Sequence, residues 1–298
     1  MADEQSSIWP YDPSFPVTIL ATVLYGLVFL AIFYLTVIKY RAWFFTAVVV
    51  GAAVEVLGYA LRCYSIKQPT QVGPFAASQT LIVLAPVLIA AGNYLLIGRL
   101  IRAVLDRART RHRVLGIPAR LLTRVFVGCD VLSCLVQASG SSISSSVQWV
   151  GTTAEVGVYV LIGGLVLQAV AFAVFLGILA RFWYLATRKG GCLAGDAPVG
   201  WERVVLAVFV SSVLIMIRCI YRVAEFAEGI EGYSFTHEWL FWVFESVPML
   251  IAIGVFCVFH PSAYLGRDGA SRKVGEPGDS EQAATELRIS YDSGRSLR

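Results

Sequence analysis

Residues 17–38 read VTILATVLYGLVFLAIFYLTVI, and this stretch carries no charged side chain. The uncharged interval around it begins after Asp12 and ends before Lys39. A helix rises about 1.5 Å per residue, so about 20 apolar residues cross the roughly 30 Å hydrocarbon core of a bilayer. The stretch therefore predicts a membrane-spanning helix.

Six further stretches of similar length and polarity follow along the chain. Of its 298 residues, 57% are hydrophobic and only 15% are charged, whereas roughly a quarter are charged in soluble domains. Strands of a transmembrane barrel would be alternating segments of about 10 residues, and these stretches are longer and apolar on every face. We therefore predict an all-α polytopic membrane protein. The seven expected spans are residues 17–38, 42–61, 78–98, 121–143, 156–180, 204–226 and 239–260.

The distribution of lysine and arginine predicts how the chain is oriented. All but four of the 24 basic residues lie in alternate connections or in the C-terminal segment, and such connections face the cytosol. We therefore expect the N-terminus outside and the C-terminus in the cytosol. The basic connections are interpreted as contacts with anionic membrane lipids, not with nucleic acid. Because the N-terminus is acidic, the first helix is expected to be its own insertion signal.

Composition divides the chain into three parts. Residues 1–16 contain three prolines and are predicted to form a short external segment. Residues 17–265 form the membrane domain. Residues 266–298 are rich in glycine, serine and charge, a composition too polar to pack. They are predicted to be a disordered cytosolic tail.

The polar residues inside the spans are the strongest pointer to a functional site. A charged side chain at the centre of a span costs roughly 2.5–3.5 kcal/mol on insertion scales, so it requires a partner or water. With the predicted orientation, these residues lie at or outside the midplane, and many share a helix face. We therefore predict a ligand-binding polar cavity in the outer half of the bundle. The candidate residues are Glu55, Tyr59, Arg62, Gln79, Asp130, Gln137, Arg218, Tyr221, Arg222, Glu225 and Glu245.

A structural alternative stays open beside the ligand site. The same acids and arginines can pair with one another and lock the helices together, and glutamines in spans commonly bond from helix to helix. Within the candidate set the acids outnumber the arginines by one, which suits a cationic ligand. The glutamates after the sixth span, Glu228, Glu231 and Glu238, are interpreted as a solvated surface.

Several kinds of chemistry lack their motifs in this sequence. It contains no G-x-x-x-x-G-K-[ST] phosphate loop and no G-x-S-x-G nucleophile elbow. Only three histidines exist, His112, His237 and His260, and no span holds a pair. We therefore expect no enzymatic activity, no metal site and no cofactor.

Several runs of residues resemble the fungal lipid-translocating exporter family, which is linked to aminocholesterol resistance. The runs are EVLGYALR at residues 55–62, Gln79 with LAP at residues 84–86, residues 91–94, residues 130–137 with Gly140, Gln168, RCIYRVAE at residues 218–225, Gly229, His237–Glu238 and His260–Pro261. The resemblance covers residues 20–265. One position departs from it: an aspartate is expected where this chain has Glu245.

The resemblance implies a fungal seven-helix protein that releases or translocates sphingoid long-chain bases and confers tolerance of amphiphilic toxins. We expect it in the plasma membrane, with an internal membrane as the alternative. The leading hypothesis places a ligand amine among Glu55, Asp130 and Glu245, while Arg218 and Arg222 hold these acids or meet a phosphate. The alternative is a seven-helix receptor or regulator that senses lipid and signals through its basic cytosolic loops. The sequence leaves the oligomeric state undefined.

Overall fold

The computed structural model describes residues 13–68, 70–107, 113–114, 117–146, 151–188, 201–229 and 232–265. The predicted external segment and cytosolic tail fall mainly or wholly outside these residues, so both stay predictions. The long helices are α1 (Phe15–Phe33), α2 (Thr46–Lys67), α3 (Val72–Arg107), α4 (Ala119–Ser146), α5 (Thr152–Arg188) and α6 (Trp201–Glu228). The remaining elements are η1 (Tyr34–Lys39), η2 (Trp43–Phe45), α7 (Tyr233–Thr236), α8 (Glu238–Phe241), η3 (Trp242–Ser246), α9 (Val247–Val258) and α10 (Pro261–Leu265).

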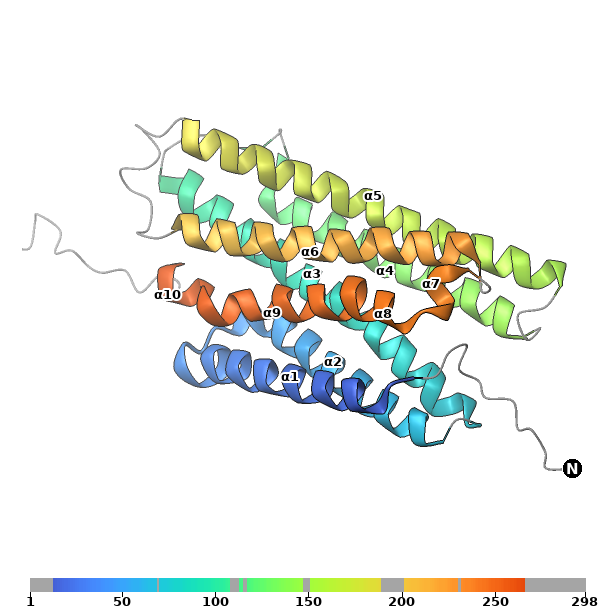
Figure 1. The fold of residues 1–298 in the computed structure, drawn as a ribbon. Helices are drawn as coiled ribbons and strands as arrows, with labels where there is room; N and C mark the ends of the chain where they lie inside the picture. The colour runs from blue at the N-terminus through green and yellow to red at the C-terminus, as the bar shows by residue number, and fades with distance from the viewer. Residues whose placement is uncertain are drawn as a thin grey trace, which may run out of the picture. The chain divides into compact units, whose positions relative to one another are not determined.

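The seven predicted spans are confirmed. In the described part of the chain, seven helices are long and apolar enough to cross a membrane. Figure 1 shows the long helices running alongside one another. The spans are Phe15–Lys39, Trp43–Lys67, Val72–Ile101, Thr123–Ser144, Thr152–Tyr184, Trp201–Glu228 and Glu238–Tyr264.

Several segments differ from a uniform set of α-helices. The first span ends in the π-helical η1, and the second begins with the 3-10 helix η2. Residues Arg113–Val114 (β1) and Ile117–Pro118 (β2) pair as two-residue antiparallel strands between α3 and α4. The seventh span is built from α8, the π-helical η3 and α9 in succession. Pro248, at the start of α9, has no N–H to donate, so the preceding backbone cannot close a regular α-helical turn onto it.

Two helix pairs approach each other closely through glycine. A Cβ added to Gly58 of α2 would lie 2.8 Å from the Ile82 side chain of α3. A Cβ on Gly140 of α4 would lie 2.6 Å from two backbone atoms of α5, the oxygen of Gly157 and the nitrogen of Leu161. Small residues let helix backbones approach in a bilayer, so the α2–α3 and α4–α5 pairs are closely packed at these glycines.

The helices differ in how far they are enclosed. The apolar window of α3 is 67% buried inside the protein, whereas that of the first span is only 22% buried. Helix α3 is thus central, and it contacts α2, α4 and α6. Exposed leucines such as Leu20, Leu27 and Leu30 cover the outer face of α1, which suits contact with lipid tails. A side chain that α3 presents to its neighbours lies in the interior of the bundle.

Candidate functional site

An ion-pair cluster joins α6 to the π-helical segment of the seventh span. Arg218 Nη2 lies 2.8 Å from Glu245 Oε1, and Arg222 Nη1 lies 3.4 Å from Glu245 Oε2. Arg222 Nη1 also lies 2.8 Å from Glu225 Oε2. The Tyr221 hydroxyl donates to Glu225 Oε1 at 3.4 Å. We call Arg218, Arg222, Glu225 and Glu245 the α6–η3 cluster; its arginines are spaced by one helical turn so that both meet Glu245.

Arg218 also satisfies a backbone group that a proline leaves open. Pro86 of α3 has no N–H, so the carbonyl of Ile82, four residues earlier, lacks its usual helical donor. Arg218 Nη2 donates to this carbonyl oxygen at 2.8 Å. One guanidinium therefore links the interrupted hydrogen-bond ladder of α3 to the carboxylate of Glu245.

Glu55 of α2 is buried next to this cluster. It is 1% exposed, and it lies within electrostatic range of Arg218 and Glu245. Its Oε2 atom has no hydrogen-bond partner among the described residues. Glu55 and the cluster together hold three carboxyl groups and two guanidiniums, so the group has one acid in excess. A buried carboxylate oxygen without a donor is a strong acceptor for an incoming cation.

Aromatic rings line the interior beside Glu55. Tyr25 of α1 stacks on Tyr59 of α2, with ring centroids 4.8 Å apart, and Tyr59 stacks on Trp242 at 6.0 Å. The Tyr25 hydroxyl donates to the backbone oxygen of Ser246 at 2.6 Å. This stack ties α1 and α2 to η3, the element that carries Glu245.

Arg62 joins three elements close to the start of α1. It is fully buried, its Nη2 lies 3.6 Å from Glu238 Oε1, and its guanidinium carbon lies 4.4 Å from the Phe241 ring centroid. Ser14 donates to Glu238 Oε2 from its backbone nitrogen and its hydroxyl, at 2.9 and 2.6 Å. The interpretation of Glu238 as solvated surface is therefore wrong, because its side chain is only 14% exposed and bridges α1 and α2.

Asp130 occupies a different neighbourhood, between α3, α4 and α5. It is 1% exposed, and the Tyr94 hydroxyl of α3 donates to its Oδ2 at 2.9 Å. The Tyr94 ring packs on Phe126 and Phe175, with centroids 5.5 and 4.6 Å away. Asp130 Oδ1 has no hydrogen-bond partner in the described ranges.

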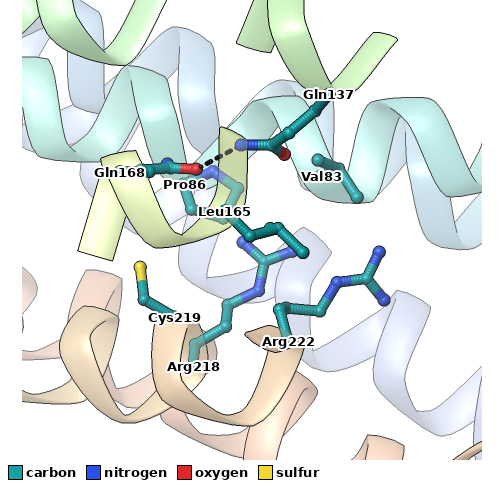
Figure 2. A pocket seen from close by; sticks show the side chains of 8 residues that line it. All are labelled: Val83, Pro86, Gln137, Leu165, Gln168, Arg218, Cys219 and Arg222. Carbon is teal, nitrogen blue, oxygen red and sulfur yellow. Dashed lines mark hydrogen bonds between the residues drawn. The ribbon is translucent and has the colours of Figure 1, made fainter. Parts of the chain in front are cut away.

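A small cavity lies between α3, α4, α5 and α6. Its volume is about 20 Å³, room for about one water molecule. Gln137 Nε2 donates to Gln168 Oε1 at 2.9 Å on one side of it, and Arg218 and Arg222 project from α6 on the other (Figure 2). The lining residues are Val83, Pro86, Gln137, Leu165, Gln168, Arg218, Cys219 and Arg222.

The candidate residues thus form several groups. One group is the α6–η3 cluster with Glu55 and Tyr221. Tyr59 and Arg62 lie against the aromatic rings of the seventh span. Asp130 pairs with Tyr94, and Gln137 lines the cavity. Gln79 is half-buried on α3 and joins none of these groups in the described part of the chain.

Sequence reasoning passed over some partners of these side chains. Tyr25 and Tyr94 sit in uncharged runs of residues and give no polar signal of their own. Tyr94 ends one of the runs that carry the resemblance. Gln168 was expected, like Gln137, to bond from helix to helix, and the hydrogen bond between these two glutamines confirms this. In the described ranges, no group of three or more His, Cys, Asp or Glu side chains could hold a metal ion.

Comparison of the sequence with known protein families identifies the family of this chain. The profile described as "RTA1 like protein" matches residues 48–268, which include all the groups above except Tyr25 and Ser14. The chain belongs to the RTA1-like family. Fungal relatives of this family include proteins named as lipid transporters.

Individual relatives are moderately similar. Protein RTM1 of Saccharomyces cerevisiae is 34% identical over 208 residues, covering 70% of this chain and 64% of that protein. Protoporphyrin uptake protein 1 of the same species is 35% identical over 209 residues, covering 70% and 65%. Sphingoid long-chain base transporter RSB1, also from S. cerevisiae, is 28% identical over 289 residues, covering 86% and 74%. The chain thus spans slightly less than two thirds of the first two relatives. No solved structure matches it.

Proposed function

We propose that this protein translocates single-chain amphiphiles with a positively charged headgroup, such as sphingoid long-chain bases, across the membrane. Its relatives support the substrate class, because they include proteins named for sphingoid base transport and lipid transport. The observation that carries the proposal is the carboxyl excess beside the α6–η3 cluster, with the buried Glu55 Oε2 atom lacking a partner among the described residues.

An amine leaving water for the interior of the bundle must find an acceptor. An unpaired charge in a low-dielectric interior is very unfavourable, and a carboxylate within contact distance offsets much of that cost. Glu55 is the acid best placed for this role, because Glu245 and Glu225 already meet arginines. The hydrocarbon chain of the ligand would lie along the apolar helix faces or in the bilayer.

The predicted topology indicates in which half of the membrane this site lies. With the N-terminus outside, Ser14, Arg62 and Glu238 lie at the external end of the bundle, and the α6–η3 cluster lies in the outer half. Asp130 would be a second acidic position nearer the midplane, along the route of the amine. The predicted location is the plasma membrane.

Efflux of a labelled long-chain base from cells that express the protein tests the proposal. Glu55→Gln removes the acceptor charge while keeping the size of the side chain, so efflux is expected to fall about tenfold or more, as for loss of one charge-assisted contact of 1.5–3 kcal/mol. Asp130→Asn is expected to reduce efflux less. Glu155→Gln, the same change at an exposed position of α5, should behave as wild type. Equal efflux from all four proteins at equal surface expression would contradict the site.

A further inference from the structure

We propose that the cavity between α3, α4, α5 and α6 binds an anionic oxygen of an amphiphile's headgroup, from a phosphate or a carboxylate. The inference rests on the proposed function for the class of ligand. It adds a second subsite, which prefers an anionic group where Glu55 prefers a cationic one. Residues of four helices build it, with Val83, Pro86 and Leu165 as the apolar part of the wall.

The polar atoms around the cavity are suited to an anion. Four of the lining residues carry side-chain N–H groups: Gln137, Gln168, Arg218 and Arg222. None of the residues that line it in the described structure is a carboxylate. A water-sized space bordered by two guanidiniums and two amides, with no acid among its lining residues, favours an oxyanion over an amine.

Arg218, one of the residues that line the cavity, has a buried donor without an acceptor in the described structure. Arg218 is 5% exposed, and its Nε atom is buried without a hydrogen-bond partner in the described part of the chain. A buried polar group left in this way loses the hydrogen bonds that it made with water, and the cost is greater when the group is charged. An anionic oxygen that enters the cavity and comes within reach of this N–H would remove that cost.

The neighbouring acids contact the two arginines at their Nη atoms and do not contact the Nε atom of Arg218. Glu245 meets Arg218 at Nη2, and both Glu225 and Glu245 meet Arg222 at Nη1. These contacts fix the two guanidinium planes through their Nη atoms, and the Nε atom of Arg218 has no hydrogen bond in the described structure. A planar arginine guanidinium held in one orientation matches the geometry of an oxyanion better than the mobile ammonium group of a lysine does.

The size of the cavity restricts what enters it. A space of about 20 Å³ admits one oxygen atom and not a whole phosphate group. A headgroup would therefore place a single terminal oxygen there. The ligand class is a single-chain amphiphile with an oxyanion headgroup, including one that also carries an amine for Glu55.

Equilibrium binding to the purified full-length protein in nanodiscs tests this subsite. The probes are hexadecyl phosphate, hexadecylamine and inorganic phosphate, so that chain and charge vary separately. Gln168→Glu places a negative charge at the cavity and is expected to weaken hexadecyl phosphate binding at least tenfold. Its affinity for hexadecylamine should be unchanged or higher. Gln71→Glu makes the same change at an exposed residue between α2 and α3 and should match wild type.

The outcomes separate the subsite from the proposed function. Saturable binding of hexadecyl phosphate that Gln168→Glu selectively weakens supports the subsite, provided both variants unfold at the wild-type temperature. Equal binding of inorganic phosphate would overturn the assignment to a headgroup. No saturable binding of either phosphate, or equal affinity in wild type and Gln168→Glu, would overturn the subsite. If the proposed function is wrong, the wild-type protein would instead show no saturable binding of hexadecylamine.

Discussion

Glu245 holds two arginines through its two carboxylate oxygens, and it is 1% exposed. Removing one member of such a buried group is far more damaging than the modest net stability of an ion pair suggests, because the remaining charges lose their compensation. At this position the chain has a glutamate where the resemblance leads one to expect aspartate. The longer side chain is consistent with Glu245 reaching both Arg218 and Arg222.

Glu245→Gln is therefore expected to destabilise the protein by about 3–5 kcal/mol. The change keeps the shape of the side chain but leaves Arg218 without its carboxylate partner. The measurement is the unfolding free energy of purified protein in detergent. Glu202→Gln, at an exposed position near the start of α6, should change it by less than about 0.5 kcal/mol. A loss at Glu245 no larger than that at Glu202 would show that the ion pairs contribute little.

The sequence indicated which side chains need partners but not which partner each one has. Helical spacing placed Arg218 and Arg222 on one face of α6, and the structure agrees. Spacing says nothing of how one helix is rotated against the next, so the pairs Arg218–Glu245 and Tyr94–Asp130 could not be deduced. For Glu238 the error was the opposite one, because a partnered side chain was predicted to be solvated. Its acidic loop suggested exposure to water, but the fold brings Arg62 and Ser14 to it.

At the scale of the elements, hydrophobic length was sufficient to locate all seven spans. A spanning backbone must satisfy its own hydrogen bonds, so a long apolar run has one structural solution. The π-helical segment η3 could not be foreseen, although Pro248 marked its neighbourhood. The bond from Arg218 to the Ile82 carbonyl was equally hidden, since Pro86 reveals the open carbonyl but not the donor that reaches it.

The α4–α5 pair offers a test of close helix packing. Gly140→Ala would place its Cβ 2.6 Å from the α5 backbone, so the helices must separate, and we expect a loss of about 1–3 kcal/mol of stability. Gly163→Ala, on α5, meets nothing within 4 Å and should be neutral or stabilising by up to about 1 kcal/mol. Thermal unfolding of the two variants checks this. Equal unfolding temperatures would contradict the packing of this pair.

At the scale of the whole molecule, the seven-helix class and the family follow from the sequence, and the arrangement of the polar interior follows only from the fold. The candidate residues, which were predicted to share one cavity, form several groups in the described structure. One group is the charge cluster with Glu55, and another lines the small cavity between α3, α4, α5 and α6. Arg218 and Arg222 belong to both groups, so these two arginines link the two parts of the candidate site.

The most direct test of this account is reconstitution of the purified full-length protein into liposomes. We expect wild type to move a labelled sphingoid base between leaflets faster than protein-free liposomes, Glu55→Gln to slow this movement about tenfold, and Glu155→Gln to leave it unchanged. Saturable binding of the base without movement would favour the lipid-sensing alternative. Movement by Glu55→Gln at the wild-type rate would contradict the claim that this buried carboxyl group receives the headgroup.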